Sequence, residues 1–209
     1  MARAAEPPSG TRDFLADDMR RRKAAFDTVS AVFERYGFDP LETPAFERLD
    51  VFAGKLGEEA SALIFKILKR GVHEATGEAD LALRYDHTVP LARVICTYGN
   101  RLPSPYKRYT IGNVWRADRA ARGRFREFAQ CDIDTVGTSS PLADAEIIWA
   151  INDSLQALAV PDFRFLINSR QALHGLLEAY RVPPQLGPQV LNSLDKLDKW
   201  QHFLAIQGR

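Results

Sequence analysis

The amino-acid sequence predicts an α+β fold, in which helices flank an antiparallel sheet and pack on one of its faces. Two observations support this prediction. Helical apolar spacing dominates both ends of the 209-residue chain, whereas its middle holds two long alternating segments, 106–118 and 125–137, joined by a short loop. Hydrophobic residues make up 45% and charged residues 26% of the chain, which is the range of a globular domain with a core and argues against disorder.

The N-terminal part begins with an Ala- and Pro-rich segment, residues 1–9, which we expect to be disordered. Apolar residues then recur at helical spacing over residues 17–36. Acidic residues at the beginning of this segment suit the positive end of a helix, and Gly37 is typical of the residue after a last turn. Pro40 and Pro44 predict extended backbone in the segment that follows.

Short elements are predicted between this helix and the alternating segments. Residues 61–70 form a helix or a strand, which the pattern alone does not separate, and a turn follows at Gly77. Residues 81–85 are predicted as a strand. Residues 89–98 are predicted as a helix that ends before Gly99.

Helices dominate the predicted C-terminal part. Ser140 followed by Pro141 is a strong signal for the beginning of a helix, which continues through Ala159. Three further elements are predicted: a strand over residues 163–167, a helix capped by Asn168 or Ser169, and a last helix after the Pro183-Pro184 break.

The second alternating segment places unlike side chains on its two faces, because alternate residues of a strand share a face. The odd-numbered face is mostly apolar and is predicted to pack on a core. The even-numbered face carries an aromatic ring, an amide and carboxylates: Arg126, Phe128, Gln130, Asp132 and Asp134. A solvent-facing surface would not require Phe128, and a core would not tolerate Asp134. We interpret this face as the floor of a site for a polar ligand that bears phosphate.

The loop between the two segments is basic. Eight Lys and Arg residues lie from Arg101 to Arg126, against Asp118 alone, although the formal net charge of the chain is only +1. That net charge provides no field that would gather nucleic acid. A basic run is either a solvated surface or an anion site, and the strand-loop-strand setting favours the anion site here.

The cysteines and histidines give no sign of metal or redox chemistry. Cys96 and Cys131 lack metal-ligand spacing and are expected to be reduced and buried. His73 and His87 have no metal partners in the sequence and are expected to have no role, so no metal site is predicted. The N-terminus has no apolar signal core and no apolar run approaches membrane-spanning length, which indicates a cytoplasmic protein without a membrane partner.

Four blocks of sequence resemble one enzyme family. Arg116, the basic loop and the segment GRFREF resemble motif 2 of class II aminoacyl-tRNA synthetases, and the continuation AQCDIDTVG narrows the resemblance to histidyl-tRNA synthetase. Residues 83–94 are similar to the amino-acid-binding turn of that family, residues 10–22 to its N-terminal opening, and residues 34–47 to the end of class II motif 1. The order and spacing of all four blocks fit the family.

The resemblance implies a class II synthetase-like catalytic core over residues 10–167, which carries motifs 1 and 2. Residues 168–209 would be the truncated beginning of the helical region that follows. Nothing after residue 199 resembles motif 3 or the anticodon-binding domain of the family. The match therefore covers about the N-terminal half of a typical synthetase.

On the nucleotide side, the resemblance implies ATP as a substrate, with Mg²⁺ expected alongside it. Arg116 would be the catalytic arginine that bridges the α-phosphate and the substrate carboxylate. Arg124 would reach the terminal phosphates, and Phe128 would stack on adenine. Each has an alternative interpretation: an ion pair of Arg116 with Asp118, a solvated loop charge at Arg124, and a core position for Phe128.

On the amino-acid side, the resemblance implies four histidine-binding residues. Asp86 and Thr88 would bind the α-ammonium, Gln130 would bind polar atoms of the substrate, and Asp134 would accept from the imidazole N–H. For the first pair, the alternative is an Asp or Thr that caps a helix after a strand. Many family members carry Glu where this chain has Asp86 and Asp134, which implies a slightly different pocket.

The implied function is that of the N-terminal catalytic portion of a histidine–tRNA ligase, which activates histidine with ATP and transfers it to tRNA(His). As a fragment, the chain is expected to be inactive alone. A homodimer through motif 1 is implied, although the helix over residues 17–36 could equally pack on its own sheet. The alternatives are a synthetase-like regulatory subunit of ATP phosphoribosyltransferase and a degenerate protein that only dimerises. Retention of Arg116, Arg124 and Gln130 favours the ligase.

Overall fold

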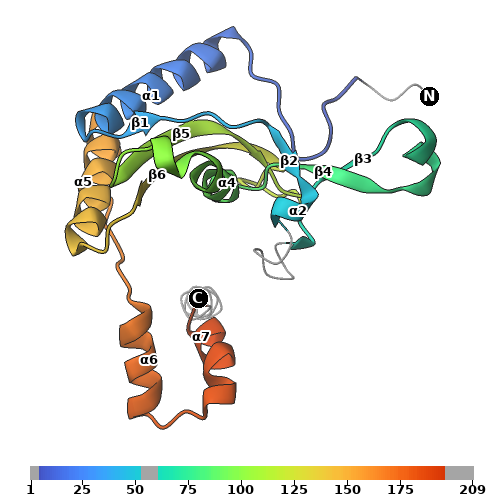
Figure 1. The fold of residues 1–209 in the computed structure, drawn as a ribbon. Coiled ribbons are helices and arrows are strands. Elements are labelled where there is room, and N and C mark those ends of the chain that lie inside the picture. The colour runs from blue at the N-terminus through green and yellow to red at the C-terminus, as the bar shows by residue number, and fades with distance from the viewer. Residues whose placement is uncertain (1–4, 53–60, 196–209) are drawn as a thin grey trace, which may run out of the picture. The chain divides into compact units, whose positions relative to one another are not determined.

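The computed structural model describes residues 5–52 and 61–195 (Figure 1). Parts of two predicted segments, residues 1–4 of the N-terminus and residues 196–209 of the C-terminal helical region, lie outside the described residues. Contacts divide the chain into two compact units, Met1–Pro161 and Asp162–Arg209. Among the described residues, no helix is long and apolar enough to cross a lipid bilayer.

The first unit is built on a hairpin of two long strands, β5 (Tyr106–Trp115) and β6 (Glu127–Val136), which pair antiparallel over their whole length. The predicted pair of strands is thus confirmed, with slightly shorter ends. A two-residue strand, β1 (Asp39–Pro40), pairs with β5 in parallel, so that β6 lies at the edge of this sheet. Proline has no N–H to donate to a ladder, which suits its place in an edge strand.

Two helices cover the odd-numbered face of the hairpin: α1 (Ala16–Arg35) and α5 (Pro141–Ala157). Both agree with the predicted helices to within two residues, and the Ser140 side chain accepts a hydrogen bond from the Leu142 N–H as the predicted cap requires. The core between helices and sheet is built from side chains of α1, β5, β6 and α5 and of the segment after α1: Val29, Phe33, Phe38, Tyr109, Ile111, Ile133, Ile147 and Ala150.

A second antiparallel sheet has the order β2-β4-β3, from Phe46–Arg48, Ala79–Leu83 and Lys66–Leu68. The strand alternative for residues 61–70 is therefore correct over Lys66–Leu68, and the strand predicted at 81–85 lies two residues earlier. A 3-10 helix, η1 (Gly71–Thr76), precedes the predicted turn at Gly77. The short helix α2 (Leu49–Phe52) completes a small core against β4 and α4 (Thr88–Tyr98), made of Phe52, Ala82 and Val89.

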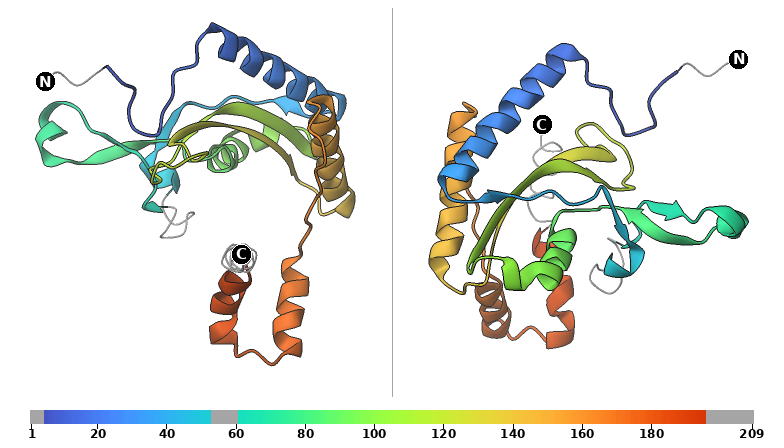
Figure 2. Two further views of the ribbon diagram at one scale, coloured as in Figure 1. Left: turned by 180° about the vertical axis from the view of Figure 1, so that it is seen from behind. Right: turned by 45° about the horizontal axis from the view of Figure 1, so that its top comes forward.

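The helix α4 lies on the opposite side of the hairpin from α1 (Figures 1 and 2), whereas the sequence predicted helices on one face only. The turn that leads into α4 explains this position. The Arg84 guanidinium donates to the carbonyl oxygens of Asn113 and Thr43, at 2.7 Å each, and His87 Nε2 lies 3.2 Å from the Gly112 oxygen. A side chain on Gly112 would meet Arg84 Nη2 at 2.9 Å, so glycine allows this close approach.

Two predictions about single residues are wrong. His87 was expected to have no role, but it is buried, and burial lowers its pKa to about 4. Cys96 and Cys131 were expected to be buried, but both are exposed. Cys96 lies near the end of α4, and Cys131 lies on the edge strand β6, where neighbouring elements leave it uncovered.

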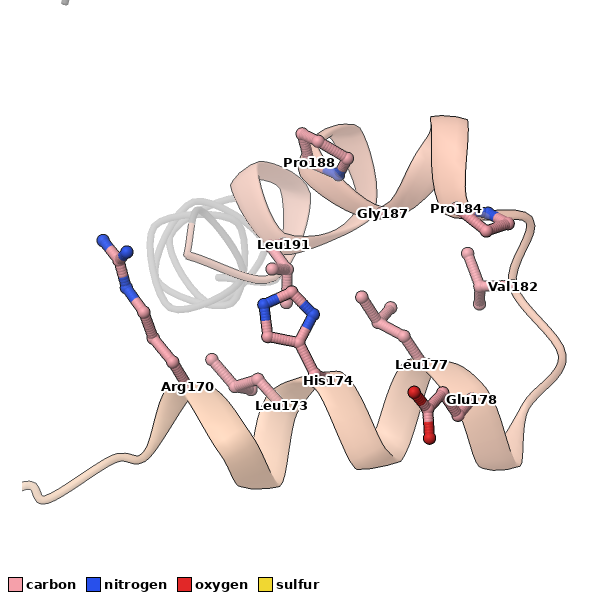
Figure 3. Close-up of a pocket in the computed structure, with 10 residues that line it drawn as sticks. All are labelled: Arg170, Leu173, His174, Leu177, Glu178, Val182, Pro184, Gly187, Pro188 and Leu191. Carbon is pink, nitrogen blue, oxygen red and sulfur yellow. The ribbon is translucent and has the colours of Figure 1, made fainter.

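The second unit contains α6 (Arg170–Ala179), the 3-10 helix η3 (Pro184–Leu186) and α7 (Gly187–Asp195). Ser169, one of the two predicted caps, accepts from the Ala172 N–H at 3.5 Å. Leu173, Leu177 and Leu191 line an apolar cavity of about 580 Å³ between the helices (Figure 3).

The strand predicted at residues 163–167 is wrong. Its aromatic residues Phe163 and Phe165 contact each other edge-on at 5.7 Å, and Leu166 and Ile167 are exposed. A strand requires a neighbour for its backbone hydrogen bonds, and no described segment pairs with these residues. Apolar alternation alone could not reveal the missing neighbour.

The segment of residues 8–14, here called the N-terminal strap, is attached to the beginning of β6. The Gly10 carbonyl accepts from the N–H groups of Arg126, at 2.7 Å, and Glu127, at 3.4 Å. The Arg12 guanidinium lies 3.5 Å from the centroid of the Phe125 ring. Gly10 has a φ of +83°, and a Cβ there would lie 2.7 Å from Arg126 Cγ. The strap therefore holds the point at which the basic loop rejoins the hairpin.

We predict that Gly10→Ala detaches the strap. Gly71→Ala is a matched control, since Gly71 has a φ of +76° and a Cβ added there would meet no atom within 4 Å. Both changes carry the cost of a positive φ, about 1–2 kcal/mol, but only the first also displaces Arg126. Trypsin should therefore cleave after Arg119, Arg122 and Arg124 several-fold faster in Gly10→Ala. Equal cleavage of the two variants would contradict the role of the strap.

Candidate functional site

The even-numbered face of the hairpin forms a polar floor. Each residue of β6 on this face lies opposite an even-numbered residue of β5, and the register pairs Val114 with Phe128, Gly112 with Gln130, Thr110 with Asp132, and Arg108 with Asp134. The turn of residues 84–88 lies over the same face, because Arg84 and His87 both contact Gly112. The structure thus places Phe128, Gln130 and Asp134 of β6 on one face, beneath the turn that carries Asp86.

Arg116 lies at one end of this floor, next to two aromatic rings. Its guanidinium carbon lies 4.3 Å from the ring centroid of Tyr85 and 5.2 Å from that of Phe128, and its Nε donates to the Tyr85 carbonyl at 3.2 Å. Asp118, the alternative partner of Arg116, instead forms an ion pair with Arg124 at 3.4 Å. Arg116 and Phe128 therefore present a cation and an aromatic ring side by side.

Arg124 lies in the loop that joins the two strands. Its side chain is 68% exposed, and its only described ion pair is the one with Asp118. Gly123 has a positive φ of 77°, which lets the chain turn tightly just before Arg124. This position fits a solvated loop charge and also fits an arginine that reaches a ligand from outside the floor.

Asp86 and Thr88 lie at the beginning of α4. Asp86 Oδ1 accepts from the Val89 N–H at 3.1 Å, so that Asp86 caps this helix as its alternative interpretation held, while Thr88 is exposed. The cap also fixes the Asp86 carboxylate near the acidic end of the floor, where burial raises the pKa of Asp132 and Asp134 and the charge of Asp86 adds to that rise. The structural and the ligand-binding interpretations of Asp86 are therefore compatible.

Asp134 lies at the other end of the floor and forms an ion pair with Arg108, whose Nη2 is 2.6 Å from Asp134 Oδ2. Arg108 is completely buried and also donates to the carbonyl of His87 at 3.2 Å. Sequence reasoning counted Arg108 in the basic run but assigned it no role. The sequence did contain a signal for this role. In the register of the hairpin, Arg108 lies opposite Asp134 and therefore on the same face of the sheet.

The charges of three carboxylates, of Asp86, Asp132 and Asp134, act on the buried guanidinium of Arg108, and Asp134 contacts it directly. Burial raises the pKa of both Asp132 and Asp134, and the charge of Arg108 opposes that rise. Between this acidic end and the Arg116 end lies Gln130, whose Oε1 is buried without a hydrogen-bond partner among the described residues. The floor can therefore bind a cation or N–H donor at one end and an aromatic anion at the other.

Comparison with known proteins identifies the family. The model of the family described as histidyl-tRNA synthetase matches residues 10–203. The histidine–tRNA ligase of Gloeobacter violaceus is 47% identical over 207 residues, which cover 91% of this chain and 44% of the relative. That of Aeropyrum pernix is 45% identical over 194 residues, with 92% and 43% covered.

Solved structures agree with these relatives. The crystal structure of histidyl-tRNA synthetase from Nostoc sp. has a TM-score of 0.79 and 34% identity, and the match covers 93% of this chain and 44% of that one. The similarity confirms the predicted α+β, class II synthetase-like fold. This chain spans a little under half the length of the curated relatives that it matches. On this evidence the chain belongs to the histidyl-tRNA synthetase family.

Proposed function

We propose that this chain carries one wall of the site at which a histidine–tRNA ligase activates histidine with ATP, before the transfer of histidine to tRNA(His). The observation that supports the proposal most strongly is the polarity of the floor, with Asp134 at one end and Arg116 beside Phe128 at the other. Phe128 and Asp134 are six residues apart, which is about 20 Å along a strand. That length accommodates an amino acid and a nucleotide end to end.

Activation joins the carboxylate of histidine to the α-phosphate of ATP, and pyrophosphate leaves. The carboxylate is itself the nucleophile, so the reaction needs no general base. Alignment of the two anions and fixed positive charge supply the rate. Arg116 suits this role because a planar guanidinium can contact an oxygen of each group, and it lies against the rings of Tyr85 and Phe128.

The Mg²⁺ that accompanies ATP would neutralise charge on the phosphates. Among the described residues, no group of three His, Cys, Asp or Glu side chains is arranged to hold a metal ion. A Mg²⁺ ion that accompanies a nucleotide usually takes one or two carboxylates together with phosphate oxygens and water, so it would not require such a group.

A regulatory role is the second candidate. A solved structure from Bacillus halodurans, titled as an ATP phosphoribosyltransferase regulatory subunit/histidyl-tRNA synthetase, has a TM-score of 0.81 but only 23% identity, so it bears on the fold alone. The curated relatives are histidine–tRNA ligases. Arg116, Arg124 and Gln130 are present and lie on or beside the floor, which supports the ligase over the regulatory subunit.

For histidine, we predict weak binding to this chain that depends on Asp134. A single wall holds a ligand less well than a closed pocket. Replacing Asp134 with Asn removes a charged acceptor and should weaken binding about tenfold or more. The measurement is a calorimetric or NMR titration with histidine, with Asp144→Asn on the exposed side of α5 as the control. Tight binding that survives Asp134→Asn would contradict the assignment.

For the nucleotide, we predict that Arg116→Met weakens ATP binding about tenfold or more, because it removes a charge-assisted contact with phosphate. The exposed loop residue Arg119 supplies the control, since Arg119→Met removes a charge from the same segment without touching the floor. Fluorescence titration with a labelled ATP analogue in the presence of Mg²⁺ measures both affinities. If the two variants lose the same affinity, the effect is one of loop charge and Arg116 has no specific role.

We also propose a homodimer through the motif 1 segment. The apolar residues Val29 and Phe33 of α1 belong to the core that α1 forms with its own sheet, which fits the alternative interpretation of that helix. Phe46, at the end of the motif 1 block, is 51% exposed and offers an apolar contact to a second copy.

Light scattering should therefore give twice the 23.5 kDa mass of one chain. Phe46→Glu should shift the mass toward the monomer, because it would bury a charge at the contact. Leu68→Glu is a matched control, since Leu68 is 53% exposed and lies on β3 of the same sheet. A monomer at all concentrations, or an equal effect of both changes, argues against this interface.

A further inference from the structure

Arg108 is the largest completely buried side chain of the described residues, and it joins three elements. It lies on β5, forms an ion pair with Asp134 on β6, and donates to the His87 carbonyl in the turn before α4. Its Nε and Nη1 have no hydrogen-bond partner among the described residues. The guanidinium therefore faces the acidic end of the floor with donors that the surrounding protein leaves unused.

A buried ion pair is an inefficient way to stabilise a fold. Removing two charges from water costs several kcal/mol, and apolar residues of similar volume at such positions are often neutral or stabilising. Arg108 lies in the interior of strand β5 and is completely buried, a position that Leu or Met could occupy. The placement of a guanidinium there is better explained by what it does to the carboxylates around it.

The charged and titratable groups near Arg108 come from each element packed against it. The turn contributes Arg84, Asp86 and His87, β6 contributes Asp132 and Asp134, and β5 contributes Tyr106. Arg116 acts on Asp132 from the other end of the floor. His87 adds no positive charge at neutral pH, because burial lowers its pKa to about 4. Arg108 is thus the cation that directly contacts Asp134, and without it the acidic end would hold three buried or half-buried carboxylates that repel one another.

We propose that Arg108 is a positioning residue, which holds the Asp134 carboxylate by a direct ion pair in the orientation that accepts from an imidazole N–H. The inference rests on the proposed function for the identity of the ligand. The ion pair at Asp134 Oδ2 leaves Oδ1 for the ligand, and the bond to His87 ties the turn that carries Asp86 to the same guanidinium. A substrate side chain without an N–H would leave Asp134 Oδ1 without a donor, so Arg108 contributes to specificity through Asp134.

The first experiment titrates the aspartate carboxyl groups of the 209-residue chain by ¹³C NMR. Arg108→Met removes the charge and keeps an apolar stem. Because Arg108 lowers the pKa of Asp134, its removal should raise that pKa by about one unit or more. Arg93→Met is the matched control, since Arg93 forms a 2.5 Å ion pair with the mostly buried Glu47 away from the floor. An Asp134 titration that is the same in Arg108→Met, Arg93→Met and the natural chain would overturn the proposal.

The second experiment measures histidine affinity against pH in the same chains. At pH values where Asp134 is newly protonated in Arg108→Met, affinity should fall about tenfold for each unit by which the pKa rises, and it should recover as the pH increases. The titration of free histidine is common to all chains and cancels in the comparison. Arg93→Met should follow the pH profile of the natural chain.

Arg108→Lys separates charge from geometry, and it serves as well if Arg108→Met does not fold. Lysine keeps a positive charge but cannot contact Asp134 and the His87 carbonyl with one planar group. We expect an Asp134 pKa near its natural value, together with weaker histidine binding. Natural binding by Arg108→Lys would overturn the positioning role. If the titration of Asp134 depends on Arg108 but no chain binds histidine, the role of Arg108 stands and the proposed function fails.

Discussion

Two buried guanidinium groups hold the turn before α4 against the hairpin, and the arrangement of the first unit depends on them. Arg84 reaches the backbone of β5 and of the segment before β2, while Arg108 reaches from β5 to the His87 carbonyl. Backbone bonds reinforce the contact, since the Arg84 N–H donates to Ala45 and the Trp115 N–H donates to Arg84. The two sheets share no strand, and these bonds of the turn are among the contacts that connect them.

The order of charges along that floor follows from strand geometry. A strand separates residues on one face by about 6.6 Å, so Phe128, Gln130, Asp132 and Asp134 form a straight row of different chemical groups. The antiparallel partner supplies a second row in register, with Arg108 beside the carboxylates and Arg116 beyond the aromatic ring. A ligand laid along the hairpin therefore meets a change from acidic to basic surroundings over its own length.

Patterns in short stretches of sequence predicted the features that depend on neighbouring residues, such as strand faces and helix ends. The period of two in residues 125–137 was sufficient to separate the core face from the floor, and the Ser140-Pro141 pair was sufficient to place the beginning of α5. Non-local contacts were beyond such patterns. The partner of Arg108, the burial of His87 and the missing neighbour of residues 163–167 depend on which elements meet in space. The cysteines illustrate the same limit. Cys131 shares a strand face with the apolar residues Ala129 and Ile133, but its strand lies at the edge of the sheet and the side chain is exposed.

The buried imidazole of His87 has a consequence for the behaviour of the turn in acid. A carbonyl oxygen can only accept, so the contact with Gly112 requires the tautomer that carries its proton on Nε2. With a pKa of about 4, against 6.5 for an exposed histidine, the ring stays uncharged in the folded protein where an unfolded chain would already bind a proton. The stability that this ring contributes is complete above pH 6.5 and declines as the pH falls toward 4. Across the neutral range His87 therefore stays uncharged, and an imidazole that titrates there beside the turn would belong to the ligand.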